Sequence, residues 1–259
     1  MAEYLSAGGL RLAYQTAGTG EPSMIFVHGW SCHRSYFAPQ FEYFAVGHAV
    51  ATMDLRGHGD SGQPDAVPGG YEMDLLADDV LAVARAAGLS KPVLVGHSLG
   101  ALIGLACAGR PGAISALVMV DPAPITNEAA KTFFRESVAA ISADDDGSWR
   151  AAFVESMFLP TDAARRAAIV ADMRRVSPRM AAELIRMMAD FDGASALGQA
   201  SVPVLSIGSA GPANSSADLR RRCPTITIGQ TVGAGHFAHL EVPEQVNAMI
   251  GKFLAINGW

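Results

Sequence analysis

Short apolar runs and longer amphipathic stretches alternate along most of the chain. Residues 10–15 alternate apolar and polar positions, as a half-buried strand does. Continuous apolar runs, typical of strands buried on both faces, occupy residues 24–27, 49–53, 93–95, 116–120 and 202–208. A last short strand is predicted at 225–228, after the run at 202–208.

Between these runs, apolar residues recur every three or four positions, which is the spacing of a helix with one buried face. The helices predicted in this way cover residues 35–44, 74–87, 101–109, 217–222 and 243–255. Strands that alternate with helices predict an α/β fold, with a doubly wound, mostly parallel sheet and right-handed connections.

The pattern changes between residues 125 and 199, where helical spacings follow one another without a strand between them. Four helices are predicted there: 128–141, one around residues 149–157, 162–175 with Thr161 as its N-cap, and 178–190. We therefore expect an α/β core of residues 1–124 and 200–259 and a helical cap of residues 125–199. A cap inserted at the carboxyl edge of a parallel sheet would lie over the active site.

Large apolar side chains of this cap are candidates for an apolar substrate pocket. The candidates are Met157, Phe158, Met187, Met188 and Phe191. The alternative for each is a packing role within the cap.

The chain has 259 residues, of which 50% are hydrophobic, and this length suits one large core with an insertion. Its formal net charge of −6 gives no reason to expect nucleic acid or a membrane surface as a partner. Cys32, Cys107 and Cys223 have no C-x-x-C spacing, so we expect buried free thiols and no metal or other cofactor. The N-terminus has no signal-peptide pattern, and a cytoplasmic location is expected.

The sharpest local signal is the change from strand to helix around Gly96-His97-Ser98-Leu99-Gly100. In such a G-x-S-x-G turn the small residues permit a strained serine whose hydroxyl is exposed above a helix N-terminus. The alternative is a chance glycine-rich turn, but the flanking strand and helix favour a nucleophile elbow at Ser98. The N–H groups of Leu99 and of Trp30, which follows the strand 24–27, are the candidate oxyanion hole.

A serine nucleophile needs a base, and His236 in the loop after the last predicted strand is the best candidate. His239 favours a packing role, and His97 is expected to point away from the nucleophile. Two further histidines, His28 and His58, are interpreted as residues that fix loops.

The loop at residues 54–62 is rich in glycine and charge but lacks the ending of a phosphate-binding loop. Asp54 and Arg56 are expected to form an ion pair that fixes this loop.

Taken together, four motifs resemble the α/β-hydrolase family over nearly the whole chain: His28-Gly29-Trp30, the segment 54–61, Gly96-His97-Ser98-Leu99-Gly100 and Gly235-His236-Phe237. The resemblance implies a catalytic triad, yet no carboxylate occupies the usual position after the strand that ends at Gly208. Some relatives take the acid from the end of the preceding strand, which indicates Asp121. Asp218 is the alternative.

The resulting hypothesis is a serine hydrolase of a carboxylic ester or lactone, acting on a largely apolar small molecule. Two alternatives remain open. One is a cofactor-free dioxygenase or another non-hydrolytic reaction on the same fold, and the other is a slow-turnover ligand-binding receptor.

Overall fold

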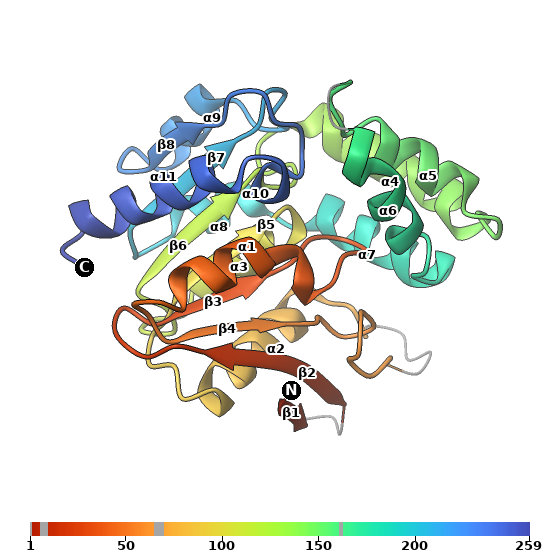
Figure 1. The fold of residues 1–259 in the computed structure, drawn as a ribbon. Helices are drawn as coiled ribbons and strands as arrows, with labels where there is room; N and C mark the ends of the chain where they lie inside the picture. Colours follow the sequence, from red (N-terminus) through yellow and green to blue (C-terminus); the bar gives the residue numbers. More distant parts are fainter. Residues whose placement is uncertain (1, 6–9, 65–69, 161–162) are drawn as a thin grey trace.

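One mixed sheet forms the centre of the structure, a computed structural model that describes residues 2–5, 10–64, 70–160 and 163–259 (Figure 1). Within these ranges the strand order is β1-β2-β4-β3-β5-β6-β7-β8. The strands are β1 (Ala2–Leu5), β2 (Arg11–Ala17), β3 (Met24–Val27), β4 (Val50–Met53), β5 (Val93–His97), β6 (Ala116–Val120), β7 (Val204–Gly208) and β8 (Thr227–Gln230). Of the described strand pairs, β1–β2 and β2–β4 are antiparallel and the others are parallel, which confirms the predicted doubly wound, mostly parallel α/β sheet.

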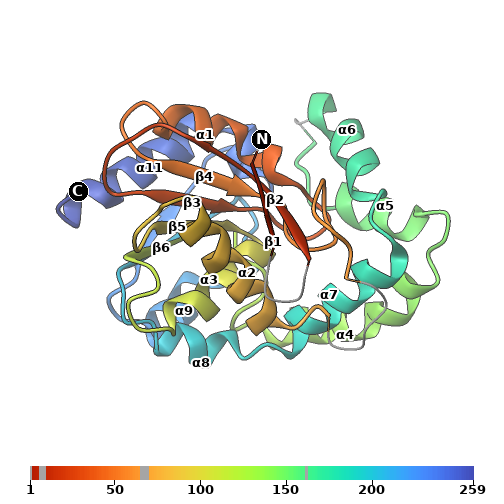
Figure 2. The ribbon, with the colours of Figure 1, turned by 90° about the horizontal axis from the view of Figure 1, so that it is seen from below.

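Helices cover both faces of the sheet (Figure 2). On one face lie α1 (Ala38–Phe44), which continues a 3₁₀ turn, and α11 (Pro243–Ile256). The other face carries α2 (Met73–Ala86) and α3 (Leu99–Ala108). Neighbouring residues of a strand point to opposite faces, so Phe26 packs in the first layer and Ile25 in the second.

Among the described residues, five helices lie between β6 and β7, and the first four gather at one end of the sheet, on the right in both ribbon views. They are α4 (Glu128–Ser142), α5 (Ser148–Glu155), α6 (Ala163–Met173), α7 (Pro178–Asp190) and α8 (Gly193–Gly198). We call residues 125–199 the helical insertion. The short α8 was not predicted, and Thr161, the expected N-cap of α6, lies outside the described residues.

Three other elements differ from the sequence prediction, and one of them, β1, has no predicted counterpart. The last strand lies two residues further along than expected, because pairing with β7 sets its position: Leu205 is opposite Thr227 and Gly208 opposite Gln230. The four-residue α10 (Ala238–Glu241) follows it, too short to leave a helical pattern in the sequence. The short α9 (Ser216–Arg222) agrees with its prediction. In the described part of the chain, no helix is long and apolar enough to cross a membrane.

Candidate active site

Ser98 lies at the turn between β5 and α3 in a backbone conformation that residues with a side chain rarely adopt, with φ 52° and ψ −112°. Its N–H donates to the carbonyl of Val120 at 3.1 Å. A Cβ added to Gly96 would collide with the carbonyl of Gly100, and one added to Gly100 would collide with that of Val27. Glycines at both positions therefore permit the tight packing that holds the strained serine.

The loop after β3 presses against this turn. A Cβ added to Gly29 would lie 3.2 Å from the Cβ of Ser98. The indole N–H of Trp30 donates to the carbonyl of Ala181 at 2.9 Å. The backbone N–H groups of Trp30 and Leu99, in contrast, donate to no acceptor among the residues that the structure describes. Leu99 is also the first residue of α3, where the helix dipole favours negative charge. Both N–H groups remain available for an oxyanion beside Ser98.

Asp121 follows β6, the strand that pairs directly with β5. One carboxylate oxygen, Oδ2, lies 2.6 Å from Nδ1 of His236, and the other accepts a hydrogen bond from the N–H of Ser209 at 3.0 Å. Asp218 lies on α9 and pairs with Arg221. The structure thus brings Asp121, and not Asp218, to His236. A carboxylate at Nδ1 holds the proton there and leaves Nε2 of the imidazole as the basic atom.

His236 lies in the loop between β8 and α10, and the helical insertion fixes this loop. Its N–H donates to the carbonyl of Met157 at 3.0 Å, and a Cβ added to Gly235 would lie 2.6 Å from the same carbonyl oxygen. His236 and Ser98 line one cavity.

His97 does not point away from the site, which corrects the expectation from the sequence. It lines the same cavity, and its Nε2 donates to the carbonyl of His236 at 2.9 Å. Burial, together with the neighbouring His239 and His236, lowers the pKa of His97 well below its usual value. The ring of His97 is therefore neutral and carries its proton on Nε2. Its hydrogen bond connects the residue before Ser98 to the loop that contains His236.

The cavity at Ser98 is small, with a volume of about 20 Å³. Of the five predicted lining residues, Met157 and Met188 lie in its wall, whereas Phe158, Met187 and Phe191 do not. The wall is completed from the insertion by Phe134, Phe153, Met173 and Ile185.

Helix faces explain which candidates line the cavity. On α7, Ile185 and Met188 are three residues apart and share one face, whereas the adjacent Met187 points about 100° away from Met188. Phe191 follows the end of α7 in an extended backbone conformation, with φ −66° and ψ 127°. Phe158 instead stacks on Phe237, with ring centroids 5.0 Å apart.

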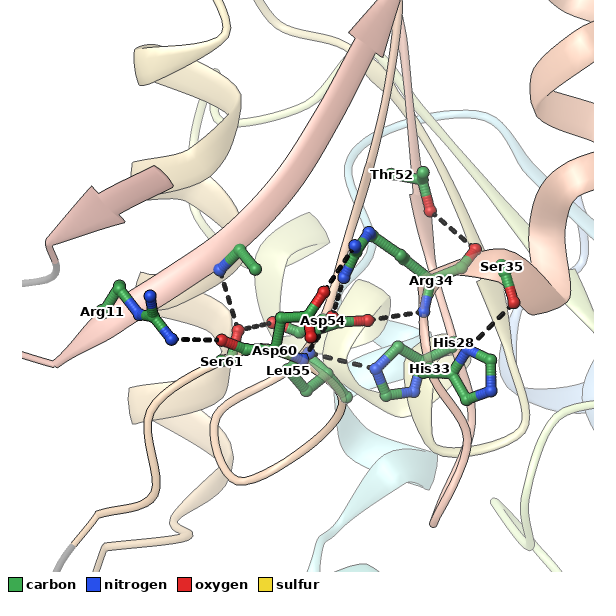
Figure 3. Close-up of polar contacts among 11 residues, drawn as sticks. Arg11, His28, His33, Arg34, Ser35, Thr52, Asp54, Leu55, Asp60 and Ser61 are labelled. Carbon is green, nitrogen blue, oxygen red and sulfur yellow. Dashed lines mark hydrogen bonds and ion pairs between the residues drawn. The ribbon is translucent and has the colours of Figure 1, made fainter. Parts of the chain in front are cut away.

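A polar network braces the loop that carries Trp30 (Figure 3). Asp54 is fully buried, accepts from the backbone N–H of Arg34 at 2.7 Å, and forms an ion pair with its guanidinium. The expected Asp54–Arg56 pair is wrong, because Arg56 turns to α2 and binds Asp79 with contacts of 2.6 and 2.9 Å. Asp54 and Arg56 therefore each form an ion pair with a residue about 20 positions away in the sequence, and not with each other.

His28 and His58 fix these loops, as the sequence predicted. Nε2 of His28 accepts from the N–H of Leu55 at 3.0 Å, and its Nδ1 donates to the carbonyl of Gly29 at 2.8 Å. Nε2 of His58 accepts from the N–H of Ser31 at 3.3 Å. Burial lowers the pKa of both rings, to about 4 for His58, which keeps them neutral at pH 7.

Comparison with known proteins identifies proteins similar to this chain in sequence and in fold. The "Putative carbamate hydrolase RutD" of Klebsiella pneumoniae (strain 342) is 36% identical over 103 residues, which are 39% of this chain and 38% of that relative. The match thus spans well under two thirds of the relative's length.

Two solved structures superpose on nearly the whole chain. An enol-lactonase from Burkholderia xenovorans LB400 has a TM-score of 0.79 at 21% identity and covers 98% of this chain and 100% of its own, which shows a shared fold. A "putative aryl esterase" from Burkholderia cenocepacia has a TM-score of 0.81 at 27% identity, with 98% of each chain covered. Residues 24–249 match the family model described as "Alpha/beta hydrolase family". The chain belongs to the alpha/beta hydrolase family.

Proposed function

We propose that the protein is a serine hydrolase that cleaves a carboxylic ester or lactone of a small molecule, with Ser98, His236 and Asp121 as its catalytic triad. The observation that carries this proposal is the 2.6 Å contact between Asp121 and Nδ1 of His236. It lies at the sheet edge that also holds Ser98 and the backbone N–H groups of Trp30 and Leu99, which donate to no described residue. The relatives described as an enol-lactonase and an aryl esterase support the same reaction class.

In this mechanism Oγ of Ser98 attacks the carbonyl carbon while its proton passes to Nε2 of His236. The N–H groups of Trp30 and Leu99 bind the resulting oxyanion, and Asp121 stabilises the imidazolium. The C–O bond then breaks, and His236 gives the proton to the leaving alkoxide. Water deprotonated by His236 attacks the acyl-enzyme and releases the carboxylic acid and Ser98.

The walls of the cavity indicate an apolar acyl group. In this proposal the helical insertion acts as the cap, and its Phe134, Phe153 and Met188 contact the acyl chain beside Ser98. Carbon and sulfur atoms dominate this lining, which disfavours a charged acyl group because burial of an unpaired charge is costly.

Covalent labelling tests the role of Ser98 directly. A fluorophosphonate should add one phosphonyl group to the wild-type protein and to Ser206→Ala, a control that removes a buried serine of β7, but not to Ser98→Ala. Hydrolysis of p-nitrophenyl esters of rising acyl length, beside a lactone panel, should be lost in Ser98→Ala alone. Turnover by Ser98→Ala at the wild-type rate would refute the mechanism and favour a reaction in which the serine only orients the substrate.

A further inference from the structure

The cavity at Ser98 is too small to hold an ester by itself. Its volume of about 20 Å³ accommodates about one water molecule. A neighbouring groove, lined by the segments 31–35, 57–63 and 172–176, has a volume of about 580 Å³. We call it the outer groove. Most of a bound ester needs space beyond the small cavity, and the outer groove offers it.

Among the described residues, one side chain, Cys32, lines both the cavity and the outer groove. Its thiol donates to the carbonyl of Trp30 at 3.3 Å, and burial raises the pKa of the thiol, so the group is small and uncharged. His33 and Asp172 meet at 3.3 Å in the wall of the groove and join the core to α6. Displacement of the Cys32 side chain by a substrate would make the two spaces one site.

The walls of the outer groove are polar, in contrast to the cavity at Ser98. Ser31 contributes a side chain that is 2% exposed, and its Oγ has no hydrogen-bond partner within the described residues. Figure 3 shows His33 and Arg34 beside Asp54 and Asp60 on this side of the molecule. The charged lining residues are the acids Glu42, Asp54, Asp60 and Asp172 and the bases Arg34 and Arg175.

This excess of carboxylates gives the groove a negative field, because acids outnumber guanidinium groups. A hydroxyl group could bond to Ser31 and to carboxylate oxygens, and a cation would be attracted. A carboxylate on the ligand would be repelled.

We propose that the outer groove binds the alcohol portion of the ester and selects alcohols that are hydroxylated or cationic, while the acyl group lies among the apolar side chains of the helical insertion beside Ser98. This inference rests on the proposed function. The acyl group stays on Ser98 through the covalent intermediate, whereas the alcohol must leave and water must enter. The alcohol therefore belongs on the side with the open groove.

Four butyrate esters of similar size test this selection at pH 7.5 by titration of the released acid. Their alcohols are propanol, glycerol at its primary position, 3-(trimethylammonio)propanol and 3-hydroxypropanoate. We expect kcat/KM to be about fivefold higher for the glycerol and ammonium esters than for propyl butyrate, and about tenfold lower for the anionic ester.

Charge variants locate the effect in the groove. Glu42 is exposed at the groove, and Glu42→Gln should raise kcat/KM for the anionic ester two- to threefold and lower it for the ammonium ester by about the same factor, both measured relative to propyl butyrate. Glu244→Gln, an equal charge change on exposed α11, is the matched control and should change none of the four. Ser31→Ala should slow the glycerol ester more than the other three.

Equal kcat/KM for the four esters, or equal effects of Glu42→Gln and Glu244→Gln, would overturn the groove assignment and leave the hydrolase intact. If none of the esters were cleaved and Ser98 took no phosphonate label, the proposed function would fail and the groove assignment with it.

Discussion

The carboxyl edge of the sheet and the helical insertion are held in place by different kinds of contact. At the sheet edge the backbone does most of the positioning: the N–H of Ser98 bonds to Val120 and that of Asp121 to Ile207, at 3.1 and 2.7 Å. In the insertion, side chains perform this task, as in the pair of Arg150 and Asp144 at 2.8 Å, each 2% exposed.

This difference matters because backbone contacts fix atoms more tightly than long side chains do. The reacting groups need positions accurate to a fraction of an ångström, and the sheet edge provides them. The pocket needs only the right shape and polarity, which exchangeable Met and Phe side chains provide. We therefore expect substitutions at the edge to change the rate, and those in the insertion to change selectivity and local stability.

The largest effect is expected at the candidate acid. Asp121→Asn should lower kcat by about 10³-fold or more, because an amide cannot hold His236 in the basic tautomer or stabilise its imidazolium. Asp218→Asn, at equal folding stability, should remain near the wild-type rate. Ester-hydrolysis kinetics measure both, and a larger loss in Asp218→Asn would contradict the assignment of the triad.

The next effect concerns the stability of the insertion. Asp144 accepts from the N–H groups of Trp149 and Arg150 as well as pairing with the buried guanidinium of Arg150. Asp144→Asn should destabilise this region by about 3 kcal/mol, because it leaves a buried charge uncompensated. Hydrogen exchange should show faster opening of α5 with β5 unchanged.

The matched control for this variant is Asp190→Asn, which breaks a half-exposed contact of 3.4 Å with Arg135. It should cost less than about 1 kcal/mol. Equal protection losses in α5 and β5 after Asp144→Asn would show that the two regions unfold as one unit.

A pH effect is expected from the buried histidines near the sheet edge. Burial lowers the pKa of His239 to about 3, against 6.5 for an unperturbed histidine. The unfolded chain then binds more protons below pH 6.5, so the free energy of unfolding should fall as the pH drops from 7 to 5.

In His239→Phe, the free energy of unfolding should fall by about 2 kcal/mol less than in the wild type between pH 6.5 and 5. Both ring nitrogens of His239 are buried and bond to no described residue, so the substitution removes no hydrogen bond of this ring. Urea unfolding at several pH values measures the slope, and an unchanged slope would show that His239 is not a source of it.

The smallest effect is expected on selectivity. Phe153 lines the cavity, whereas Phe191, also half-buried in the insertion, does not. Phe153→Ala should lower kcat/KM for hexanoate esters about tenfold relative to acetate, through lost apolar contact. Phe191→Ala should leave this ratio unchanged, and an equal change in both would place the acyl chain elsewhere.

Features that depend on local sterics could be predicted from the sequence. The turn at Ser98 needs glycines at 96 and 100 whatever surrounds it, and the buried strands need continuous apolar runs. The rule that parallel strands are joined by right-handed connections predicted that β5 and β6 are neighbours in the sheet. Because they are neighbours, the carboxylate of Asp121 lies at the sheet edge that also holds Ser98.

Features that depend on contacts between distant elements could not be predicted in this way. Arg56 binds Asp79 and not Asp54, and His97 bonds to the loop of His236, because packing of α2 and of the last loop decides which partners are within reach. The lining of the cavity likewise depends on how each helix of the insertion is rotated about its axis. This rotation places Phe134 and Phe153, which were not predicted, in the cavity wall.

The sequence by itself therefore determined the sheet, the turn at Ser98 and the candidate base, since short-range sterics and hydrophobic periodicity specify them. Only the tertiary structure decided which carboxylate contacts His236 and which side chains surround Ser98. It also showed that the polar outer groove is separated from the cavity at Ser98 by the side chain of Cys32. These depend on distances between segments far apart in the chain, and no local pattern encodes such distances.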